Sequence, residues 1–298
     1  MKKTLAIALA LVCCLGLLAA CGEPASDPSE APASEAPASE APASEAPSSE
    51  PIELTGIVNT DGSTSMNDVM LALIEGFKSV QPGVTVNYNG SGSGSGISGV
   101  LAGSCDLGLS SRALTDDEKA EGAVENVIAK DGVAVVVNPA NPVTELTSEQ
   151  IAKIFTGEIT NWSEVGGEDA EIAVFGRDSA SGTRSAFEEI LGIQDKCAYL
   201  NEYSSTGDVI GNVASNPNAI GYASLSAVDE SVAAVSVDGV IPTEETVADG
   251  SFPIQRPFVV VTVEGTELSP AAQAFLDYAM SAEVADIIAA AGAVAANA

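Results

Sequence analysis

Arginine is rare in this chain, and its placement is the strongest chemical signal in the sequence. There are four arginines against 42 acidic residues. Three of the four lie in two short segments rich in serine, Ser110–Arg112 and Arg177–Arg184. A guanidinium group is a fixed fork of donors that matches phosphate or carboxylate oxygens, and small hydroxyl side chains add further donors. Because so acidic a chain repels anions at long range, this clustering predicts a local anion site.

Three turns made of serine, threonine and glycine stand where helices are expected to begin, at residues 62–65, 93–96 and 181–183. A helix N-terminus offers free N–H groups and about half a positive charge. The hydroxyl donors at these turns are Thr64, Ser65, Ser93, Ser181 and Thr183. One such turn alone is usually just a helix cap, and Arg177 or Arg112 alone could be a surface ion-pair partner. Together they favour a small, multiply charged oxyanion as the ligand.

Several other kinds of chemistry are disfavoured by the composition. The chain has no histidine, which removes a Ser-His-Asp triad and the commonest zinc ligand, and its formal net charge of −31 argues against nucleic-acid binding. The segment Gly94–Gly99 matches a dinucleotide fingerprint, but no acidic residue ends a second strand at the required distance. We therefore expect no cofactor and no metal. Cys105 and Cys197 form either a disulfide or, as we favour, two buried free thiols.

The first 51 residues are predicted to lie outside the fold. Two lysines precede the apolar run 5–20, and the segment Leu-Ala-Ala-Cys21 resembles the lipobox of bacterial lipoproteins. That resemblance implies a signal peptide at 1–20 and an acylated (palmitate-type) Cys21 that anchors the protein at the extracytoplasmic face of the cell membrane. An ordinary signal peptide or a transmembrane helix is the alternative, although the run is short for a span. Residues 21–51 repeat Ala-Pro-Ala-Ser-Glu and predict a solvated tether.

The elements that must position the anion site are alternating strands and helices within residues 52–298. A strand near Ile57-Val58 leads through the first turn into helical spacing over Met66–Val80. Continuous apolar runs at Val133–Val137 and Phe258–Val263 predict buried strands. The class is therefore α/β, with mainly parallel sheets. In such folds ligands bind beyond the carboxyl ends of the strands, where the serine-rich turns fall.

These motifs together resemble the phosphate-binding proteins of high-affinity bacterial phosphate ABC transporters, over residues 54–290. The matching segments are Gly62–Ser65, the turn at 90–96, Asp106–Arg112, Ile154–Gly157 with Asn161-Trp162, Arg177 with Ser181–Thr183, and Ile220–Tyr222. The resemblance implies a two-lobed periplasmic-binding-protein fold (type II) with the ligand cleft between its lobes. Lobe 1 would comprise 52–137 and 256–298, and lobe 2 would comprise 138–255.

The resemblance also implies a function without catalysis. The protein would capture inorganic phosphate outside the cytoplasm and deliver it to the permease subunits of an ABC transporter with a cytoplasmic ATPase. By position, the ligands implied are Thr64, Ser65, Ser93, Arg177, Ser181, Gly182 and Thr183. The strand-end residues Ser111 and Arg112 complete the candidate set.

One position departs from the family pattern. Many members carry an aspartate where Ser111 stands, and that carboxylate accepts the proton of bound HPO₄²⁻ and so excludes sulfate. A hydroxyl accepts but also donates, so selectivity for phosphate over sulfate is left open. The alternatives are therefore another tetrahedral oxyanion such as sulfate or, in a different class, an extracytoplasmic phosphoester hydrolase. A purely structural or adhesive surface protein would explain the tether but not the clustered arginines.

Overall fold

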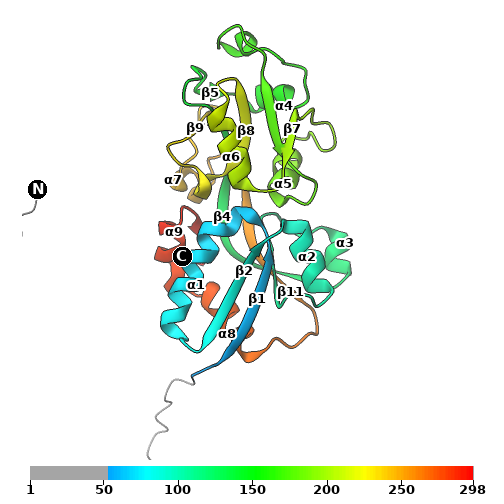
Figure 1. The fold of residues 1–298 in the computed structure, drawn as a ribbon, viewed down its shortest axis with the longest axis vertical. Coiled ribbons are helices and arrows are strands. Elements are labelled where there is room, and N and C mark those ends of the chain that lie inside the picture. Colours follow the sequence, from blue (N-terminus) through cyan, green and yellow to red (C-terminus); the bar gives the residue numbers. More distant parts are fainter. Residues whose placement is uncertain (1–52, 298) are drawn as a thin grey trace, which may run out of the picture. The chain divides into compact units, whose positions relative to one another are not determined.

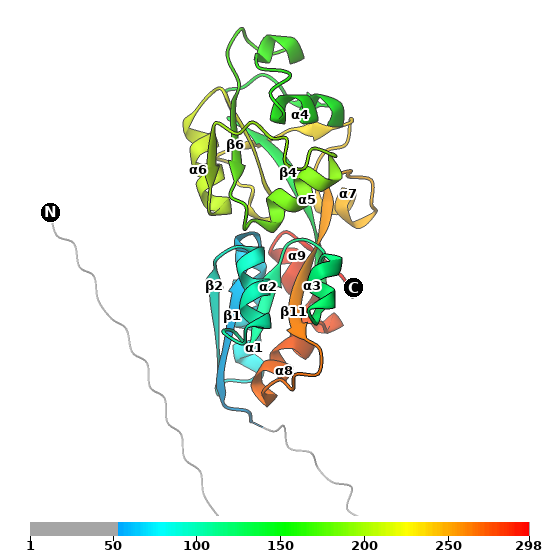
Figure 2. The ribbon, with the colours of Figure 1, turned by 90° about the vertical axis from the view of Figure 1, so that its right-hand side faces the viewer.

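The computed structural model describes residues 53–297, which fall within one compact unit of the chain (Figures 1 and 2). The expected signal peptide at 1–20, the acylated Cys21 and the tether at 21–51 lie outside the described residues. They stay predictions.

The strands of the described residues form two sheets. The strands are β1 Gly56–Gly62, β2 Val84–Gly90, β3 Leu107–Ser110, β4 Ala123–Val137, β5 Glu145–Leu146, β6 Ala173–Arg177, β7 Asn201–Tyr203, β8 Ala219–Ser224, β9 Ala233–Ala234, β10 Ser236–Val237, β11 Gln255–Val263 and β12 Val294–Ala295. The larger sheet has ten strands in the order β2-β1-β3-β11-β4-β8-β6-β7, with β12 and β9 also paired with β4. The smaller sheet pairs β10 with β5.

Helices follow most of the strands. The α-helices are α1 Asn67–Val80, α2 Ser93–Leu101, α3 Asp116–Ala120, α4 Ser148–Phe155, α5 Gly182–Ile190, α6 Thr206–Ser215, α7 Glu244–Ala248, α8 Pro270–Ala279 and α9 Ala285–Ala290. Short 3₁₀ helices occupy Thr64–Met66, Trp162–Val165, Leu225–Ala227 and Ala282–Val284. The α/β class predicted from the sequence is confirmed.

The expectation of mainly parallel sheets is wrong in part. The pairs β1–β2, β1–β3, β6–β8, β6–β7 and β10–β5 are parallel. The antiparallel pairs all involve β4 or β11. The physical reason is that these two long strands run in opposite directions and pair with each other over most of their length. The sequence pattern identified only the apolar parts of both strands.

The strands β4 and β11 pass between two bodies of helices and strands (Figures 1 and 2). One hydrophobic core includes residues of α1, β3, α8 and α9, and a second includes residues of α4, α5 and β8. β4 contributes to both, with Ile128 in the first core and Val133 in the second. A strand pair shared by two separately packed bodies is a natural place for a hinge.

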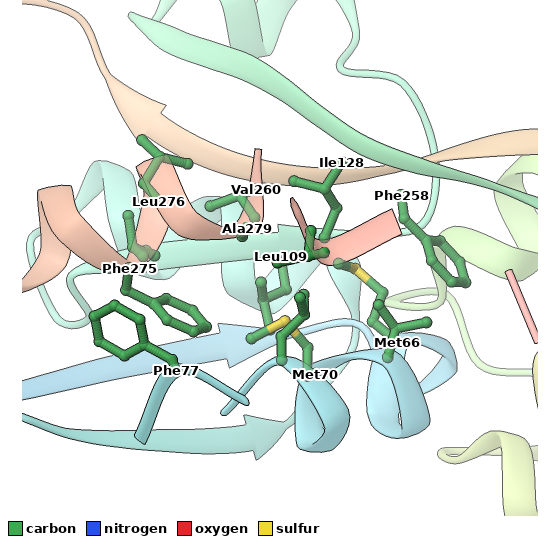
Figure 3. Packing of buried hydrophobic residues seen from close by; sticks show 14 of the residues in the cluster. Met66, Met70, Phe77, Leu109, Ile128, Phe258, Val260, Phe275, Leu276 and Ala279 are labelled. Carbon is green, nitrogen blue, oxygen red and sulfur yellow. The ribbon is translucent and has the colours of Figure 1, made fainter. Parts of the chain in front are cut away.

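The first core explains the helical spacing seen after the first turn. Met66, at the end of the 3₁₀ turn before α1, and the α1 residues Met70 and Phe77 are buried against the sheet and α8 (Figure 3). The rings of Phe77 and Phe275 meet edge to face, with centroids 5.2 Å apart. Burial of each such side chain contributes about 1.5–3 kcal/mol. This packing anchors the start of α1, and thus the 62–65 turn, to the end of β1.

The second core is aromatic and supports the other half of the anion site. Phe187 of α5 stacks on Tyr222 of β8 with centroids 4.2 Å apart, and Phe155 of α4 packs edge to face on Phe187. Trp162 is buried and donates its indole N–H to the carbonyl of Asn218. α5 is therefore held firmly on the sheet, which fixes where its N-terminus points.

Candidate anion-binding site

The beginnings of several helices meet in one polar cluster. Hydrogen bonds link the 3₁₀ turn that precedes α1 with the first turns of α5 and α6: Ser65 Oγ lies 2.6 Å from Thr183 Oγ1 and 3.0 Å from Thr206 Oγ1. α2 joins through its backbone, because the N–H of Gly94 donates to the carbonyl of Ala180 at 3.0 Å. Helix N-termini concentrate free N–H groups and positive potential, so this cluster is suited to an anion.

Arg177 lies at the end of β6 and is the charged centre of the cluster. Its side chain is almost fully buried, with 2% of the residue exposed. The guanidinium donates to Thr64 Oγ1 at 2.9 Å, to Thr206 Oγ1 at 3.0 Å and to the carbonyls of Tyr203 and Ser204. All these acceptors are neutral. Within residues 53–297, Arg177 forms no salt bridge: no carboxylate oxygen lies within 4.0 Å of its guanidinium nitrogens.

Burial lowers the pKa of Arg177 from its ordinary value, and although the nearby Tyr222, Asp178 and Asp208 oppose this effect, the net shift is downward. Arginine nevertheless stays protonated in proteins at neutral pH. A buried cation without a carboxylate partner is costly unless an anion compensates it. This electrostatic imbalance is the main chemical property of the site.

A second wall of the cluster is formed by Ser93, Ser111 and Gly182. The Ser111 N–H donates to Ser93 Oγ at 3.1 Å, and the two hydroxyl oxygens lie 3.3 Å apart. A Cβ atom on Gly182 would lie 2.7 Å from Ser93 Cβ and 3.0 Å from Ser111 Oγ. Glycine is therefore needed at position 182, because the start of α5 approaches the start of α2 closely. Ser93, Ser111 and Gly182 thus lie next to one another.

Ser181 is the N-cap of α5 and is buried. Its Oγ accepts the N–H of Arg184 at 3.2 Å, which leaves the hydroxyl hydrogen available to a ligand. The Arg184 side chain pairs with Glu188 and Glu202 and donates to the carbonyl of Arg177 at 3.0 Å. Arg184 therefore braces the strand end that carries Arg177.

Arg112 forms a salt bridge with Glu118, a carboxylate that is not part of this cluster. Its guanidinium makes a two-point contact with Glu118, at 2.7 and 2.8 Å, and also donates to the carbonyl of Ala113. Burial tends to raise the pKa of Glu118, but the hydrogen bonds and charge of Arg112 together with the hydrogen bonds from Thr115 outweigh it and hold that pKa below its ordinary value. A ligand role for Arg112 stays a prediction. The other candidate residues are brought together: Thr64, Ser65, Ser93, Ser111, Arg177, Ser181, Gly182 and Thr183.

Sequence reasoning missed Thr206, Asp131 and Arg256. Thr206 opens α6 directly after its N-cap Ser205, and a Ser-Ser-Thr run ahead of helical apolar spacing is the same signal that marked the other turns. The fourth arginine, Arg256, lies in β11 and has no hydroxyl-rich neighbourhood in sequence. Only the pairing of β11 with β4 brings it near Ser111, to whose carbonyl it donates at 3.0 Å.

The described residues contain no group of three His, Cys, Asp or Glu side chains that could hold a metal ion. Cys105 and Cys197 are free thiols, as we favoured over a disulfide, but both are partly rather than fully buried. Burial raises the pKa of each thiol to about 11. Over residues 53–297, no helix has the length and apolar character needed to cross a bilayer.

Comparison with known proteins agrees with this geometry. The PBP superfamily domain matches residues 31–283. The phosphate-binding protein PstS of Borreliella burgdorferi is 31% identical over 244 residues, which cover 78% of this chain and 87% of the relative. PstS of Bacillus subtilis is 34% identical over 235 residues, covering 77% of each chain.

Among solved structures, a proposed phosphate ABC transporter substrate-binding protein from Clostridium perfringens, crystallised with bound phosphate, is similar with a TM-score of 0.79 and 41% identity. The match covers 81% of this chain and all of that one. The fold and the site define a two-lobed binding protein of the periplasmic-binding-protein class, as predicted. This chain belongs to the PBP superfamily and, within it, to the family of PstS phosphate-binding proteins of ABC transporters.

Proposed function

We propose that this protein captures inorganic phosphate outside the cytoplasm and delivers it to the permease of a phosphate ABC transporter. The observation that carries the proposal is Arg177, a buried guanidinium held among neutral hydroxyls and carbonyls with no carboxylate partner in the described residues. A doubly charged oxyanion supplies the missing charge. The relatives named above support phosphate as that anion.

The proposed ligands supply almost only donors. Arg177 offers charge, and the N-termini of α2 and α5 offer backbone N–H groups, including that of Gly182. The hydroxyl donors proposed are Thr64, Ser65, Ser93, Ser181 and Thr183. Phosphate is held by these hydrogen bonds, and no bond of the ligand is broken. The protein therefore acts by binding and release, not as an enzyme.

Ser111 is the proposed acceptor for the proton of HPO₄²⁻. It is buried at the end of β3 and its peptide is held on both sides, by Ser93 Oγ at the N–H and by Arg256 at the carbonyl. A hydroxyl can turn its hydrogen away from the ligand to accept, or toward it to donate. We therefore propose that phosphate is preferred over sulfate by a smaller factor than a carboxylate would give.

Three further parts of the proposal concern the whole chain. The lobes are 52–137 with 256–298 and 138–255, and they close on the ligand by bending at β4 and β11. Cys21 is acylated and holds the protein at the outer face of the membrane through the 21–51 tether. The loaded protein docks on permease subunits that are driven by a cytoplasmic ATPase.

Calorimetric titration of the purified protein with phosphate tests the proposal. Arg177→Ala should weaken binding by about 2–5 kcal/mol, because the ligand charge would remain buried without a counter-charge. Lys153→Ala is the matched control, since this cation is exposed on α4 and, within residues 53–297, forms a salt bridge only with Glu149. The assignment fails if Arg177→Ala binds phosphate as tightly as the wild type. Competition between phosphate and sulfate in the same titration separates the two oxyanions.

A further inference from the structure

A fully buried ion pair lies on the two strands that connect the lobes. Asp131 of β4 and Arg256 of β11 stand directly opposite each other in the antiparallel ladder. The Nε and Nη2 groups of Arg256 both donate to Asp131 Oδ2, at 3.1 and 2.9 Å. The two side chains are 1% and 0% exposed, which makes this the most deeply buried salt bridge within residues 53–297.

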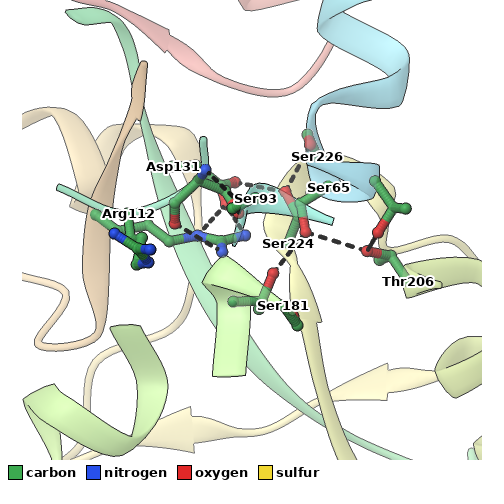
Figure 4. Close-up of polar contacts among 12 residues, drawn as sticks. Ser65, Ser93, Arg112, Asp131, Ser181, Thr206, Ser224 and Ser226 are labelled. Atoms are coloured by element: carbon green, nitrogen blue, oxygen red, sulfur yellow. Dashed lines mark hydrogen bonds and ion pairs between the residues drawn. The ribbon is translucent and has the colours of Figure 1, made fainter. Parts of the chain in front are cut away.

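The pair is joined at both ends to other buried polar groups. Arg256 Nη1 donates to the carbonyl of Ser111 at 3.0 Å. At the other end, Ser224 Oγ donates to Asp131 Oδ1 at 2.8 Å; Asp131 and Ser224 are labelled in Figure 4. Ser224 ends β8, which packs in the second core, whereas Ser111 follows β3, which packs in the first. A continuous row of four buried residues thus runs from the candidate anion site across the connecting strands to the other body.

Stability alone is a poor reason for this arrangement. Burying two charges costs several kcal/mol, and well-packed apolar residues in place of a buried ion pair are often neutral or stabilising. Two apolar side chains could not donate a hydrogen bond to the carbonyl of Ser111, as Arg256 does. That carbonyl bond and the bond from the Ser111 N–H to Ser93 together determine where the Ser111 hydroxyl lies.

We infer that Arg256 is a positioning residue for phosphate recognition: held by Asp131, it fixes the Ser111 peptide so that the hydroxyl can accept the proton of the bound anion. This inference rests on the proposed function. Sulfate carries no proton at neutral pH, so a displaced Ser111 hydroxyl should weaken phosphate binding more than sulfate binding. The ratio of the two affinities therefore reports on positioning, whereas a purely structural role would change both affinities alike.

The test uses the double variant Arg256→Met/Asp131→Leu, which removes both charges and leaves neither buried alone. We expect phosphate binding to weaken by about 10-fold and the phosphate-to-sulfate ratio to fall by at least about 3-fold. Lys153→Gln/Glu149→Gln is the control, because it also removes one charge of each sign but lies on the exposed face of α4. In a Ser111→Ala background, removing the Arg256 pair should no longer change the ratio.

An unchanged phosphate-to-sulfate ratio in the folded double variant overturns the inference. The inference also fails if removing the pair lowers the ratio as much in the Ser111→Ala background as in the wild type. If the double variant does not unfold cooperatively, Arg256→Lys decides instead. Lysine keeps the charge but cannot contact Asp131 and Ser111 at once through a planar fork. We expect the phosphate-to-sulfate ratio to fall in Arg256→Lys as well, and a wild-type ratio in this variant would contradict the inference. If the wild type itself does not bind phosphate, the proposed function fails, which is a different result.

Discussion

Adding one methyl group to Gly182 should separate ligand affinity from fold stability. Gly182 opens α5, and its approach to α2 leaves no room for a side chain. In Gly182→Ala the new Cβ would lie 2.7 Å from Ser93 Cβ, where ordinary contacts are 3.4–4 Å. Rotation of the serine hydroxyl cannot relieve this contact, because the Ser93 Cβ is fixed to the start of α2.

The contact is relieved only if the two helix starts move apart by roughly 0.7 Å, since overpacked sites yield by backbone shifts. Such overpacking costs about 1–3 kcal/mol, so phosphate affinity should fall by about 5- to 150-fold. If the lobes move as proposed, the free protein opens between them and avoids this cost. Replacing a helical glycine with alanine contributes about 0.4–1 kcal/mol to stability, so the free variant should unfold at the same temperature as the wild type or higher.

The assay pairs calorimetric titration of phosphate with thermal unfolding in the absence of phosphate. Gly211→Ala is the control, because Gly211 lies inside α6 and an added Cβ there meets nothing within 4 Å. That variant should gain stability and keep its affinity. Wild-type affinity in Gly182→Ala would show that the two helix starts do not close on the ligand as we propose.

Three further outcomes are expected. Thr206→Val removes the hydroxyl that accepts from Arg177 and contacts Thr64 and Ser65 of the first turn; phosphate binding should weaken by about 1 kcal/mol, measured by titration. Glu118→Gln should lose about 0.5–1 kcal/mol of stability at neutral pH. Because the bonds from Arg112 hold the folded pKa of Glu118 below 4.5, that stability is present above pH 4.5 and disappears as pH falls through the folded pKa, so urea unfolding of wild type and variant should converge in acid. The two described cysteines, with pKa values near 11, should react with iodoacetamide much more slowly at pH about 8 than a free thiol of pKa about 8.5, and fast alkylation in the folded state would contradict this.

Much of the site was predictable because its signals are local. A hydroxyl-rich turn followed by helical apolar spacing marks a helix start, and the structure has helix starts just after residue 63, at Ser93 and at Gly182. Arg177 was identifiable because it ends a short apolar strand beside one of these turns. The strand β4 was only half predicted, since its first half mixes buried, partly buried and exposed positions without regular alternation while its second half ends in a continuous apolar run.

The partners of the arginines could not be predicted from the sequence. Arg112 and Arg177 stand in similar serine-rich settings, yet Arg112 contacts Glu118 and Arg177 contacts only neutral acceptors. The difference arises because Glu118 belongs to a capping box at α3 that places its carboxylate within reach of Arg112. Asp178 directly follows Arg177, but its carboxylate accepts the N–H of Ala180 and, within residues 53–297, forms no salt bridge with Arg177.

The sequence by itself determined the α/β class, the helix-start turns, the family resemblance and the anionic nature of the ligand. These follow from residue type and short-range spacing, which act within one turn or one strand. Only the tertiary structure decided that Thr206 joins the cluster, that Arg112 contacts Glu118 outside the cluster, and that Asp131 and Arg256 stand behind Ser111. Those contacts join residues 6 to 145 positions apart. They depend on which strands pair and in which register, and no local pattern encodes that.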